Sequence, residues 1–302
     1  MLQVLPPPIV GAIALSLLTV NTVFWVALFI PVIAARLVVA SARFRQRCSA
    51  VLIAFAWRWV GVNSWVVAAT QNLVWDVALP EGLDPTRSYL VVCNHRSWTD
   101  IFVLQHVFRG RVPFLRFFLK KELFWVPFLG IAWWALEFPF MQRHSRAFLA
   151  KHPELRGRDM ETTRRHCEKF RSAPVSVLNF LEGTRFTPGK HRAQASPFAH
   201  LLKPRAGGVA YVLAAMGDAL SGVLDVTIAY PELPPGAILW QLLQGKIPRI
   251  VVRARLLPLP ADTVGRDYVE DTDFSARMRA WVDRIWQEKD RLLDRLQGPA
   301  GS

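Results

Sequence analysis

The sequence predicts an α/β fold, a mixed β-sheet flanked by helices and preceded by an N-terminal pair of membrane-associated helices. After residue 80, short apolar runs with strand composition alternate with helical patterns. A long uncharged run lies close to the N-terminus. The chain has 302 residues, 52% of them hydrophobic, which is enough for one full core and an additional apolar element. We therefore expect membrane-anchoring helices at residues 1–75 and an α/β domain at residues 76–302.

The first expected element is a membrane-spanning helix. Residues 9–35 carry no charge, and about 20 apolar residues suffice for a helix to cross a bilayer. Pro31 is expected to bend or end this helix near its far side. Four arginines follow, and the positive-inside rule places them in the cytoplasm. They are Arg36, Arg43, Arg45 and Arg47. A buried helix of a soluble protein is the alternative, which the length of the run disfavours.

The second expected element is an interfacial helix. Residues 51–74 are apolar and rich in tryptophan, but Arg58 interrupts them. A charge is costly in hydrocarbon and tryptophan prefers the membrane interface, so a half-inserted helix is favoured over a second span. Two complete spans would also return the following domain to the periplasmic side.

The α/β domain begins after a turn-rich linker at residues 76–88. Strands are predicted at residues 89–93, 112–119, 138–141, 175–181, 223–230 and 249–256. Helices are predicted from residue 97 onward and at residues 123–136, 159–172, 207–220 and 274–296. A basic loop is expected at residues 188–202. A second loop, at residues 231–248, carries apolar residues suited to touch a membrane.

The charge of the chain narrows the range of partners. The net charge is +14 and the isoelectric point is about 10.5, so phospholipid head groups, nucleic acid or phosphorylated substrates are the candidate partners. Zinc-finger spacing, an RNP-like aromatic strand and a low-complexity basic tail are all missing from the sequence, and the apolar N-terminus favours lipid over nucleic acid. Three cysteines do not make a disulfide framework and fit a reducing compartment. The scattered histidines show no metal-ligand spacing, so we expect no metal site.

The first polar motif, at residues 94–100, follows the apolar run that ends at Cys93. Ligands of α/β proteins often bind in the turn after a strand. If His95 precedes the helix and Asp100 lies in its first turn, the two side chains can touch. The carboxylate would then orient the imidazole, whose other nitrogen becomes a positioned base. Alternatively, Asp100 serves only to cap the helix with Ser97. Cys93 invites a nucleophile hypothesis, but a cysteine ending an apolar strand is more often a small buried hydrophobe.

The second polar motif follows the strand predicted at residues 175–181. It offers a carboxylate at Glu182, a tight turn at Gly183, a hydroxyl at Thr184 and a guanidinium at Arg185. Arginine is suited to bind phosphate through two parallel hydrogen bonds. A surface ion pair on a loop is the alternative interpretation.

Together the two motifs resemble the signature pair of the glycerolipid acyltransferases, the family of 1-acylglycerol-3-phosphate acyltransferase. The resemblance covers about residues 55–295. Residues 120–130 are similar to the connecting block of the family, and residues 138–143 to its substrate-binding block. Residues 202–208 and 225–230 are similar to the branch that contains the lysocardiolipin acyltransferases. Many members have a proline where this chain has Asp225, a departure that bears on the acceptor more than on the chemistry.

The resemblance implies transfer of a fatty acyl chain from acyl-CoA or acyl-carrier protein to the free hydroxyl of a lysophospholipid. The acceptor it implies is 1-acylglycerol 3-phosphate, and the product is phosphatidic acid. His95 would act as the base and Asp100 would orient it. The substrate-binding residues would be Asn94, Arg96, Lys120, Arg143, Glu182, Gly183, Thr184 and Arg185. The acyl thioester is a co-substrate, and no cofactor is expected.

The expected location is a bacterial-type inner membrane, with the catalytic domain facing the cytoplasm and membrane phospholipids as partners. Another lysophospholipid as acceptor, or a membrane-bound thioesterase or hydrolase, is the alternative function. A hydrolase of the common type would need a nucleophilic serine, and the chain has no Gly-x-Ser-x-Gly motif. A basic, membrane-anchored binding protein would not explain two polar motifs at two strand ends.

Overall fold

The structure is a computed structural model that describes residues 4–141, 167–168, 170 and 173–297. Six strands form one sheet, in the order β1-β8-β7-β2-β6-β3. Their bounds are Val74–Ala78 for β1, Ser88–Cys93 for β2, Leu115–Phe117 for β3, Ser176–Phe180 for β6, Leu220–Ala229 for β7 and Arg249–Leu257 for β8. Only the β7–β8 pair is antiparallel. The sheet is therefore mixed, and the predicted fold class is confirmed.

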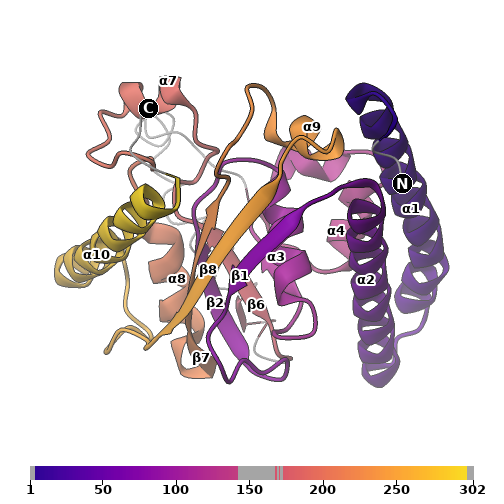
Figure 1. The fold of residues 1–302 in the computed structure, drawn as a ribbon. Coiled ribbons are helices and arrows are strands. Elements are labelled where there is room, and N and C mark those ends of the chain that lie inside the picture. Colours follow the sequence, from indigo (N-terminus) through magenta and orange to yellow (C-terminus); the bar gives the residue numbers. More distant parts are fainter. Residues whose placement is uncertain (1–3, 142–166, 169, 171–172, 298–302) are drawn as a thin grey trace.

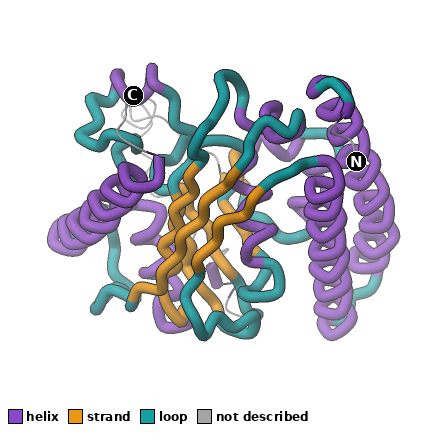
Figure 2. The backbone as a smooth tube through the Cα atoms, in the orientation of Figure 1, coloured by secondary structure: helices purple, strands orange, loops and turns teal. Residues whose placement is uncertain are grey.

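Helices cover both faces of this sheet (Figures 1 and 2). The face toward the N-terminus carries α1 (Pro7–Val38), α2 (Ala42–Thr70), α3 (Thr99–Phe108) and α4 (Leu129–Ala135). The other face carries α8 (Gly207–Met216) and α10 (Thr272–Gln297). Strand β2 shows why its sequence is apolar without interruption. Its alternate residues Val91 and Cys93 face the first group of helices, while Leu90 and Val92 face the second.

The N-terminal helices α1 and α2 form a hairpin that packs on α3, α4 and α9 (Ile238–Leu243). Asn21 joins the pair by donating a hydrogen bond to Asn63 Oδ1 at 2.8 Å. Both helices are long and apolar enough to cross a membrane by length and composition alone. The sequence predicted this property for only one of them. Only 22% of the apolar window of α1 and 28% of that of α2 are buried, whereas the core helix of a soluble protein is mostly buried.

Two predictions about these helices need correction. Pro31 does not end α1, which continues to Val38. A proline costs a helix one backbone hydrogen bond, and a long apolar helix supported by packing can absorb that loss. The second apolar segment forms a helix from Ala42 to Thr70, and Arg58 is accommodated because its side chain is exposed. Val74 and Trp75, which we assigned to the anchoring helices, begin strand β1 instead.

Several elements of the α/β domain also differ from prediction. The strand expected at residues 112–119 divides into β3 and the two-residue β4 (Leu119–Lys120), which pairs with β5 (Phe140–Met141). The helix expected at residues 123–136 divides into a 3₁₀ turn (Lys121–Trp125) and α4. Pro127 explains this division, since the residue before a proline is pushed out of the helical region and Val126 is extended.

The missed elements have only five or six residues, which is too short for a clear periodic pattern. Residues 76–78 of strand β1 were assigned to a linker, and two short helices, α7 (Pro188–Ala193) and α9, were assigned to loops. The helix predicted at residues 207–220 ends as α8 at Met216 and continues as a 3₁₀ turn (Gly217–Ala219). The helix predicted at residues 159–172 lies largely outside the described residues. Helix α10 is confirmed nearly to its predicted ends, because its apolar stripe is regular.

Candidate active site

His95 and Asp100 meet at the carboxyl end of β2. His95 lies in the turn after the strand, and Asp100 is in the first turn of α3. His95 Nδ1 lies 2.9 Å from Asp100 Oδ2. The same oxygen accepts hydrogen bonds from the backbone N–H groups of Arg96 at 2.6 Å and Ser97 at 2.8 Å. Asp100 therefore both caps the start of α3 and contacts the imidazole, so the two interpretations of this residue hold together.

This arrangement determines which ring nitrogen of His95 can act as a base. An ionised carboxylate only accepts hydrogen bonds, so the nitrogen facing Asp100 carries the proton. The neutral ring is then unprotonated at Nε2. The ring also stacks on Phe180, with centroids 3.9 Å apart and planes 15° apart. Carboxylate and aromatic ring together hold the imidazole in one orientation.

Tyr230 completes the environment of Asp100, and sequence reasoning gave it no role. Its hydroxyl donates a hydrogen bond to Asp100 Oδ1 at 2.6 Å, so both carboxylate oxygens are engaged. Burial raises the pKa of the Tyr230 phenol well above its usual value, so the group stays a donor. Tyr230 follows β7 directly and Asp100 follows β2. Because these strands are parallel neighbours, their carboxyl ends meet. The one sequence signal for Tyr230 was the alternation of side chains along β7, which puts Tyr230 on the same face as Val226 and Ile228.

Glu182 joins the two polar motifs through the backbone. Its Oε1 accepts a hydrogen bond from the His95 N–H at 2.7 Å, and its Oε2 accepts one from the Leu202 N–H at 3.1 Å. The side chain is fully buried. Burial raises the pKa of the Glu182 carboxyl to about 7, although these two hydrogen bonds act in the opposite direction. The geometry favours a positioning role for Glu182 beneath His95 over direct contact with substrate.

Further contacts interlock the two motifs. The Phe186 N–H donates to the His95 carbonyl oxygen at 2.7 Å. The Arg96 guanidinium lies over the Phe186 ring at 4.7 Å, and the Arg185 guanidinium lies over the Trp98 ring at 5.4 Å. Each motif thus places an arginine on an aromatic ring of the other. Arg185 remains exposed, with its guanidinium available to a ligand.

Other predicted site residues occupy different positions. Asn94 is buried, and its amide makes two hydrogen bonds of 2.9 Å with the Ile228 backbone, which join β2 to β7 beside the site. Gly183 turns with φ +65°, and an added Cβ would lie 3.1 Å from Arg205 Cδ. Lys120 is exposed on β4 and has no hydrogen bond or ion pair with either motif among the described residues. Arg143 lies outside the described residues.

The nucleophile hypothesis for Cys93 fails on geometry. The thiol is buried, and burial raises its pKa well above the usual value, so it stays neutral. The hydroxyl of Ser97 is also occupied, donating to Thr99 Oγ1 at 3.1 Å. Within the described part of the chain, no group of three or more His, Cys, Asp or Glu side chains could hold a metal ion.

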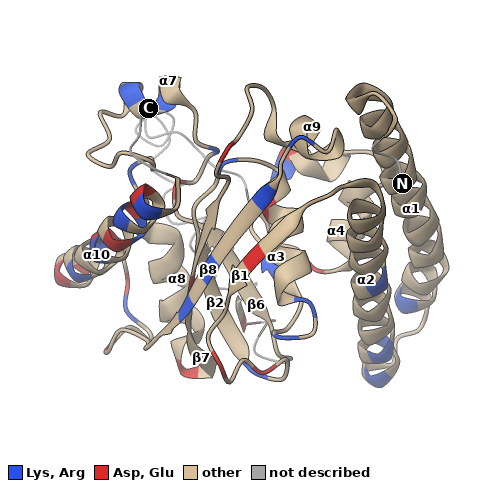
Figure 3. Ribbon diagram, viewed as in Figure 1, with Lys and Arg blue, Asp and Glu red and all other residues tan. Residues whose placement is uncertain are grey.

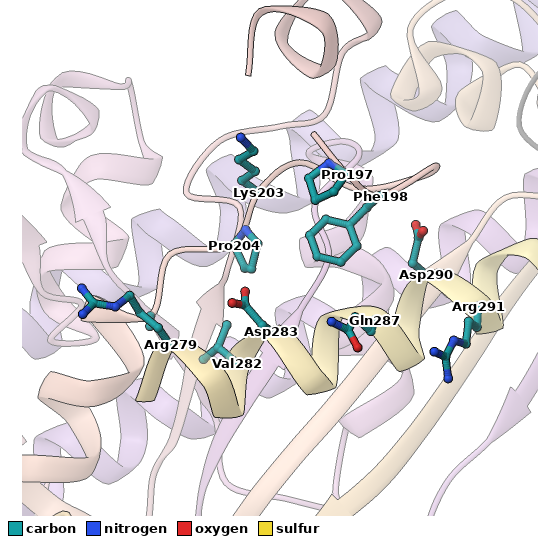
Figure 4. Close-up of a pocket in the computed structure, with 11 residues that line it drawn as sticks. Pro197, Phe198, Lys203, Pro204, Arg279, Val282, Asp283, Gln287, Asp290 and Arg291 are labelled. Carbon is teal, nitrogen blue, oxygen red and sulfur yellow. The ribbon is translucent and has the colours of Figure 1, made fainter. Parts of the chain in front are cut away.

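A separate groove of about 570 Å³ lies between α10 and the segment that follows α7 (Figure 4). None of the residues of the two motifs lines it. Asp290 on its edge accepts hydrogen bonds from the N–H groups of Ala199 and His200 at 2.8 and 2.9 Å. Trp286 donates to the Leu202 carbonyl oxygen at 2.9 Å. Helix α10 thereby anchors the segment whose Leu202 N–H supports Glu182.

Known proteins with similar sequences are acyltransferases. The chain is 29% identical over 266 residues to lysocardiolipin acyltransferase 1 of Danio rerio, and the matched region covers 80% of this chain and 62% of that protein. It is 28% identical over 218 residues to 1-acyl-sn-glycerol-3-phosphate acyltransferase delta of Homo sapiens, covering 68% of this chain and 52% of that protein. The chain therefore spans between about half and three fifths of the length of these relatives.

A solved structure and a family profile complete the comparison. The fold resembles the 1-acyl-sn-glycerophosphate acyltransferase PlsC of Thermotoga maritima, with a TM-score of 0.50 and 19% identity. The match covers 95% of this chain and 97% of that one. The profile described as Acyltransferase matches residues 75–230, which are just over half of the chain and include both motifs. The protein thus belongs to the acyltransferase family.

Proposed function

We propose that this protein transfers a fatty acyl chain from an acyl thioester to the free hydroxyl of a lysophospholipid. The observation that carries the proposal is the His95–Asp100–Tyr230 arrangement, which leaves one imidazole nitrogen as a positioned base at the edge of the sheet. The relatives named above act, by their names, on lysocardiolipin and 1-acylglycerol 3-phosphate. We propose 1-acylglycerol 3-phosphate as the acceptor and phosphatidic acid as the product.

The proposed reaction is a direct transfer. His95 Nε2 takes the proton of the acceptor hydroxyl while its oxygen attacks the thioester carbonyl carbon. The carbon–sulfur bond then breaks, and the imidazolium returns the proton to the leaving thiolate. Asp100 stays ionised and stabilises the imidazolium, while Tyr230 holds the second carboxylate oxygen. The acceptor hydroxyl is itself the nucleophile, so no acyl-enzyme forms.

We assign Arg185 to the phosphate of the acceptor. The guanidinium is exposed next to the first motif and is held over Trp98, so its fork is oriented before the ligand arrives. Gly183 and Thr184 would contribute backbone and hydroxyl contacts to the same phosphate. Acyl-CoA and acyl-carrier protein are both compatible donors.

We also propose that the helical hairpin holds the enzyme at the cytoplasmic face of a bacterial-type inner membrane. Figure 3 shows basic residues gathered around the turn that joins α1 and α2, with little charge along α1. Leu17, Val20 and Phe24 of α1 are exposed, as are Trp125 and Trp134 near α4. These apolar side chains would enter the lipid.

The contacts of α1 with the rest of the protein bear on how deeply the helical hairpin enters the membrane. Gly11, near its start, lies against Trp240 of α9, and Arg36, near its end, donates to the Ala135 carbonyl oxygen at 3.2 Å. The α/β domain thus lies alongside the full length of α1. We therefore favour a hairpin whose outer face rests in one leaflet over two complete crossings.

A thioesterase is the alternative, and acceptor dependence separates the two functions. Purified protein in detergent is mixed with acyl-CoA, with and without 1-acylglycerol 3-phosphate, and free CoA and phosphatidic acid are measured. We expect CoA release only with the acceptor, in equal amount to phosphatidic acid. Release of CoA without the acceptor would indicate a thioesterase instead.

His95→Ala tests the base directly. We expect loss of transfer by a factor of about a thousand or more, with an unchanged melting temperature, because a turn residue contributes little core area. His106→Ala is the control. His106 is also on α3, but it bonds Ser64 of α2 at 2.9 Å, and its loss should leave turnover within about threefold of wild type.

A further inference from the structure

Cations beyond Arg185 surround the turn of the second motif. Lys190 Nζ donates to Thr184 Oγ1 at 2.7 Å and to the Arg185 carbonyl oxygen at 3.0 Å. On the other side of the turn, the Arg205 side chain runs beside Gly183, within 3.1 Å of where a Cβ would lie. Lys190 and Arg205 therefore flank residues 183–185 from two different segments of the chain.

The acidic side chains in the described part of the chain do not pair with these cations. Among the described residues, Arg185, Lys190 and Arg205 form no ion pair with a carboxylate. Glu182 is close in sequence, but its two oxygens are buried and accept backbone hydrogen bonds. Lys203 lies on the edge of the groove, where its ammonium points away from Asp283 and Asp290 (Figure 4). Like charges gathered in this way repel one another unless an anion binds between them.

The placement of these side chains distinguishes the cluster from a random basic surface. Lysine side chains on a surface are usually free to rotate, and ordering one costs conformational entropy. Lys190 is ordered by two hydrogen bonds to the turn itself. Arg205 is tied to the strand before the turn, since its N–H donates to the Leu181 carbonyl oxygen at 2.8 Å. The Lys190 ammonium and the Arg205 backbone are therefore both fixed next to the turn that carries Arg185.

We propose that Lys190 and Arg205 form a second anion subsite, which binds a phosphate other than the one held by Arg185. This inference rests on the proposed function, because it takes Arg185 as the ligand of the glycerol phosphate of the acceptor. A single phosphate carries a charge of about −1.5 to −2 and three acceptor oxygens, which one arginine and the backbone of the turn can satisfy. The additional cations match a substrate with a further phosphate ester.

Two substrates could supply that phosphate, an acceptor with a second phosphodiester or the nucleotide of acyl-CoA. Steady-state kinetics separate them. Acceptors with one phosphate (1-acylglycerol 3-phosphate) and two (monolysocardiolipin) are compared with acyl-CoA as donor. Acyl-CoA and acyl-pantetheine, which lacks the nucleotide, are then compared with one acceptor. Each pair is measured for wild type, Lys190→Gln and Arg205→Gln.

We expect each variant to lower kcat/KM about tenfold to a hundredfold for the substrate that carries the second phosphate. Its partner in the pair should change less than about threefold. A loss confined to monolysocardiolipin assigns the subsite to the acceptor, and one confined to acyl-CoA assigns it to the donor. Equal loss in every pair, or no loss in any, would overturn the proposal.

Arg192→Gln is the matched control, because Arg192 is an exposed cation on the same short helix and makes no hydrogen bond or ion pair with the turn in the described part of the chain. It should behave as wild type in every pair. All variants are exposed substitutions, and an unchanged melting temperature should accompany the kinetic effect.

A binding measurement keeps the inference separate from the proposed function. Titration calorimetry compares the binding of glycerol 3-phosphate, bis(glycerophospho)glycerol and adenosine 3′,5′-bisphosphate to the full chain without turnover. We expect one of the two doubly phosphorylated probes to lose affinity at least tenfold in Lys190→Gln and Arg205→Gln, with glycerol 3-phosphate unaffected. Wild-type affinity of both variants for all three probes would refute the subsite. Absence of acyl transfer with normal probe binding would instead refute the proposed function.

Discussion

Two buried polar clusters lie on opposite faces of β7, and they have opposite characters. On one face, Tyr230 follows the strand and bonds Asp100, which in turn contacts His95. On the other face, the fully buried Lys289 of α10 pairs with Asp225 at 2.6 Å. Successive residues of a strand point to opposite faces. Tyr230 comes five residues after Asp225, an odd number, so the two side chains lie on opposite faces.

The two clusters differ in whether every charged atom has a partner. Lys289 Nζ also bonds the Val226 carbonyl and Thr227 Oγ1, and the second oxygen of Asp225 accepts from Arg255 Nε at 2.9 Å. That network is closed and holds α10 on the sheet. In the other cluster, no described residue bonds His95 Nε2, whereas Nδ1 lies against Asp100 and the ring stacks on Phe180. A buried carboxylate and cation are therefore not evidence of catalysis on their own, and the unoccupied nitrogen is what separates the site from the structural pair.

The largest effect is expected from Asp100→Asn. The amide oxygen can still accept the N–H groups of Arg96 and Ser97, and the Tyr230 hydroxyl can turn to accept from the new amide, so folding should be retained. The neutral side chain no longer stabilises an imidazolium, and we expect kcat to fall about ten-thousandfold. Measured turnover within tenfold of wild type would remove Asp100 from the mechanism.

A substitution in the cluster of Lys289, Asp225 and Arg255 should lower stability and leave turnover unchanged. Lys289→Met leaves Asp225 buried with Arg255 as its remaining ionic partner, and removing one member of a buried ion pair costs about 3–5 kcal/mol. Denaturant unfolding should show this loss of stability, while kcat and KM of the folded enzyme stay near wild type at low temperature. Arg291→Met, an exposed substitution on the same helix, should leave stability within about 0.5 kcal/mol. Loss of turnover without loss of stability in Lys289→Met would contradict a structural role.

Tyr230→Phe should weaken the cluster of His95, Asp100 and Tyr230 but leave the contact between His95 and Asp100 in place. Loss of a hydrogen bond to a charged group corresponds to about 1.5–3 kcal/mol, so kcat should fall about tenfold to a hundredfold with KM nearly constant. Tyr268→Phe is the control, because the Tyr268 ring packs on Tyr211 and Phe274, and its hydroxyl makes no hydrogen bond to a described residue of the site. A kcat of Tyr230→Phe within about threefold of wild type would exclude the positioning role of Tyr230.

The smallest effect is expected from Glu182→Gln. Glutamine offers one acceptor oxygen, so either the His95 or the Leu202 N–H loses its partner, and we expect turnover to fall about tenfold. The pKa of Glu182 is raised to about 7, so this carboxyl favours the folded state most below its unfolded pKa of about 4.5. That contribution is lost as pH rises through 7. The variant should lack this part of the pH dependence of unfolding. Glu270→Gln, which is exposed, should retain it, and identical pH dependence in Glu182→Gln and wild type would contradict the raised pKa.

Local signals in the sequence were sufficient for the main features of the fold. Apolar-rich runs predicted β2, β6 and β7, and in β2 a strand covered on both faces needs apolar residues at every position. Strand β8 was predicted although Arg253 and Arg255 alternate with its apolar residues. The regular stripe of α10 predicted that helix. Strand β1 was missed because its residues are exposed or half-buried and a charged residue, Asp76, lies at its centre. In the structure Asp76 pairs with Arg253 at 2.8 Å. Its identity as a strand comes from pairing with β8, a partner about 175 residues away.

The candidate site divides in the same way. The chain order alone placed His95 and Asp100 within reach, because five residues spanning a strand end and a helix start bring the side chains together. The sequence also predicted Arg185 as a phosphate ligand, a role that stays a prediction, and the structure shows that its side chain is exposed. The sequence did not show that the buried side chains of Glu182 and Asn94 bond the backbone near the site, or that Tyr230 bonds Asp100. The partners in these hydrogen bonds are about 87 to 134 residues apart in the sequence. Contacts between neighbours follow from local geometry, whereas contacts between distant residues depend on which strands pair, and only the assembled sheet decides that.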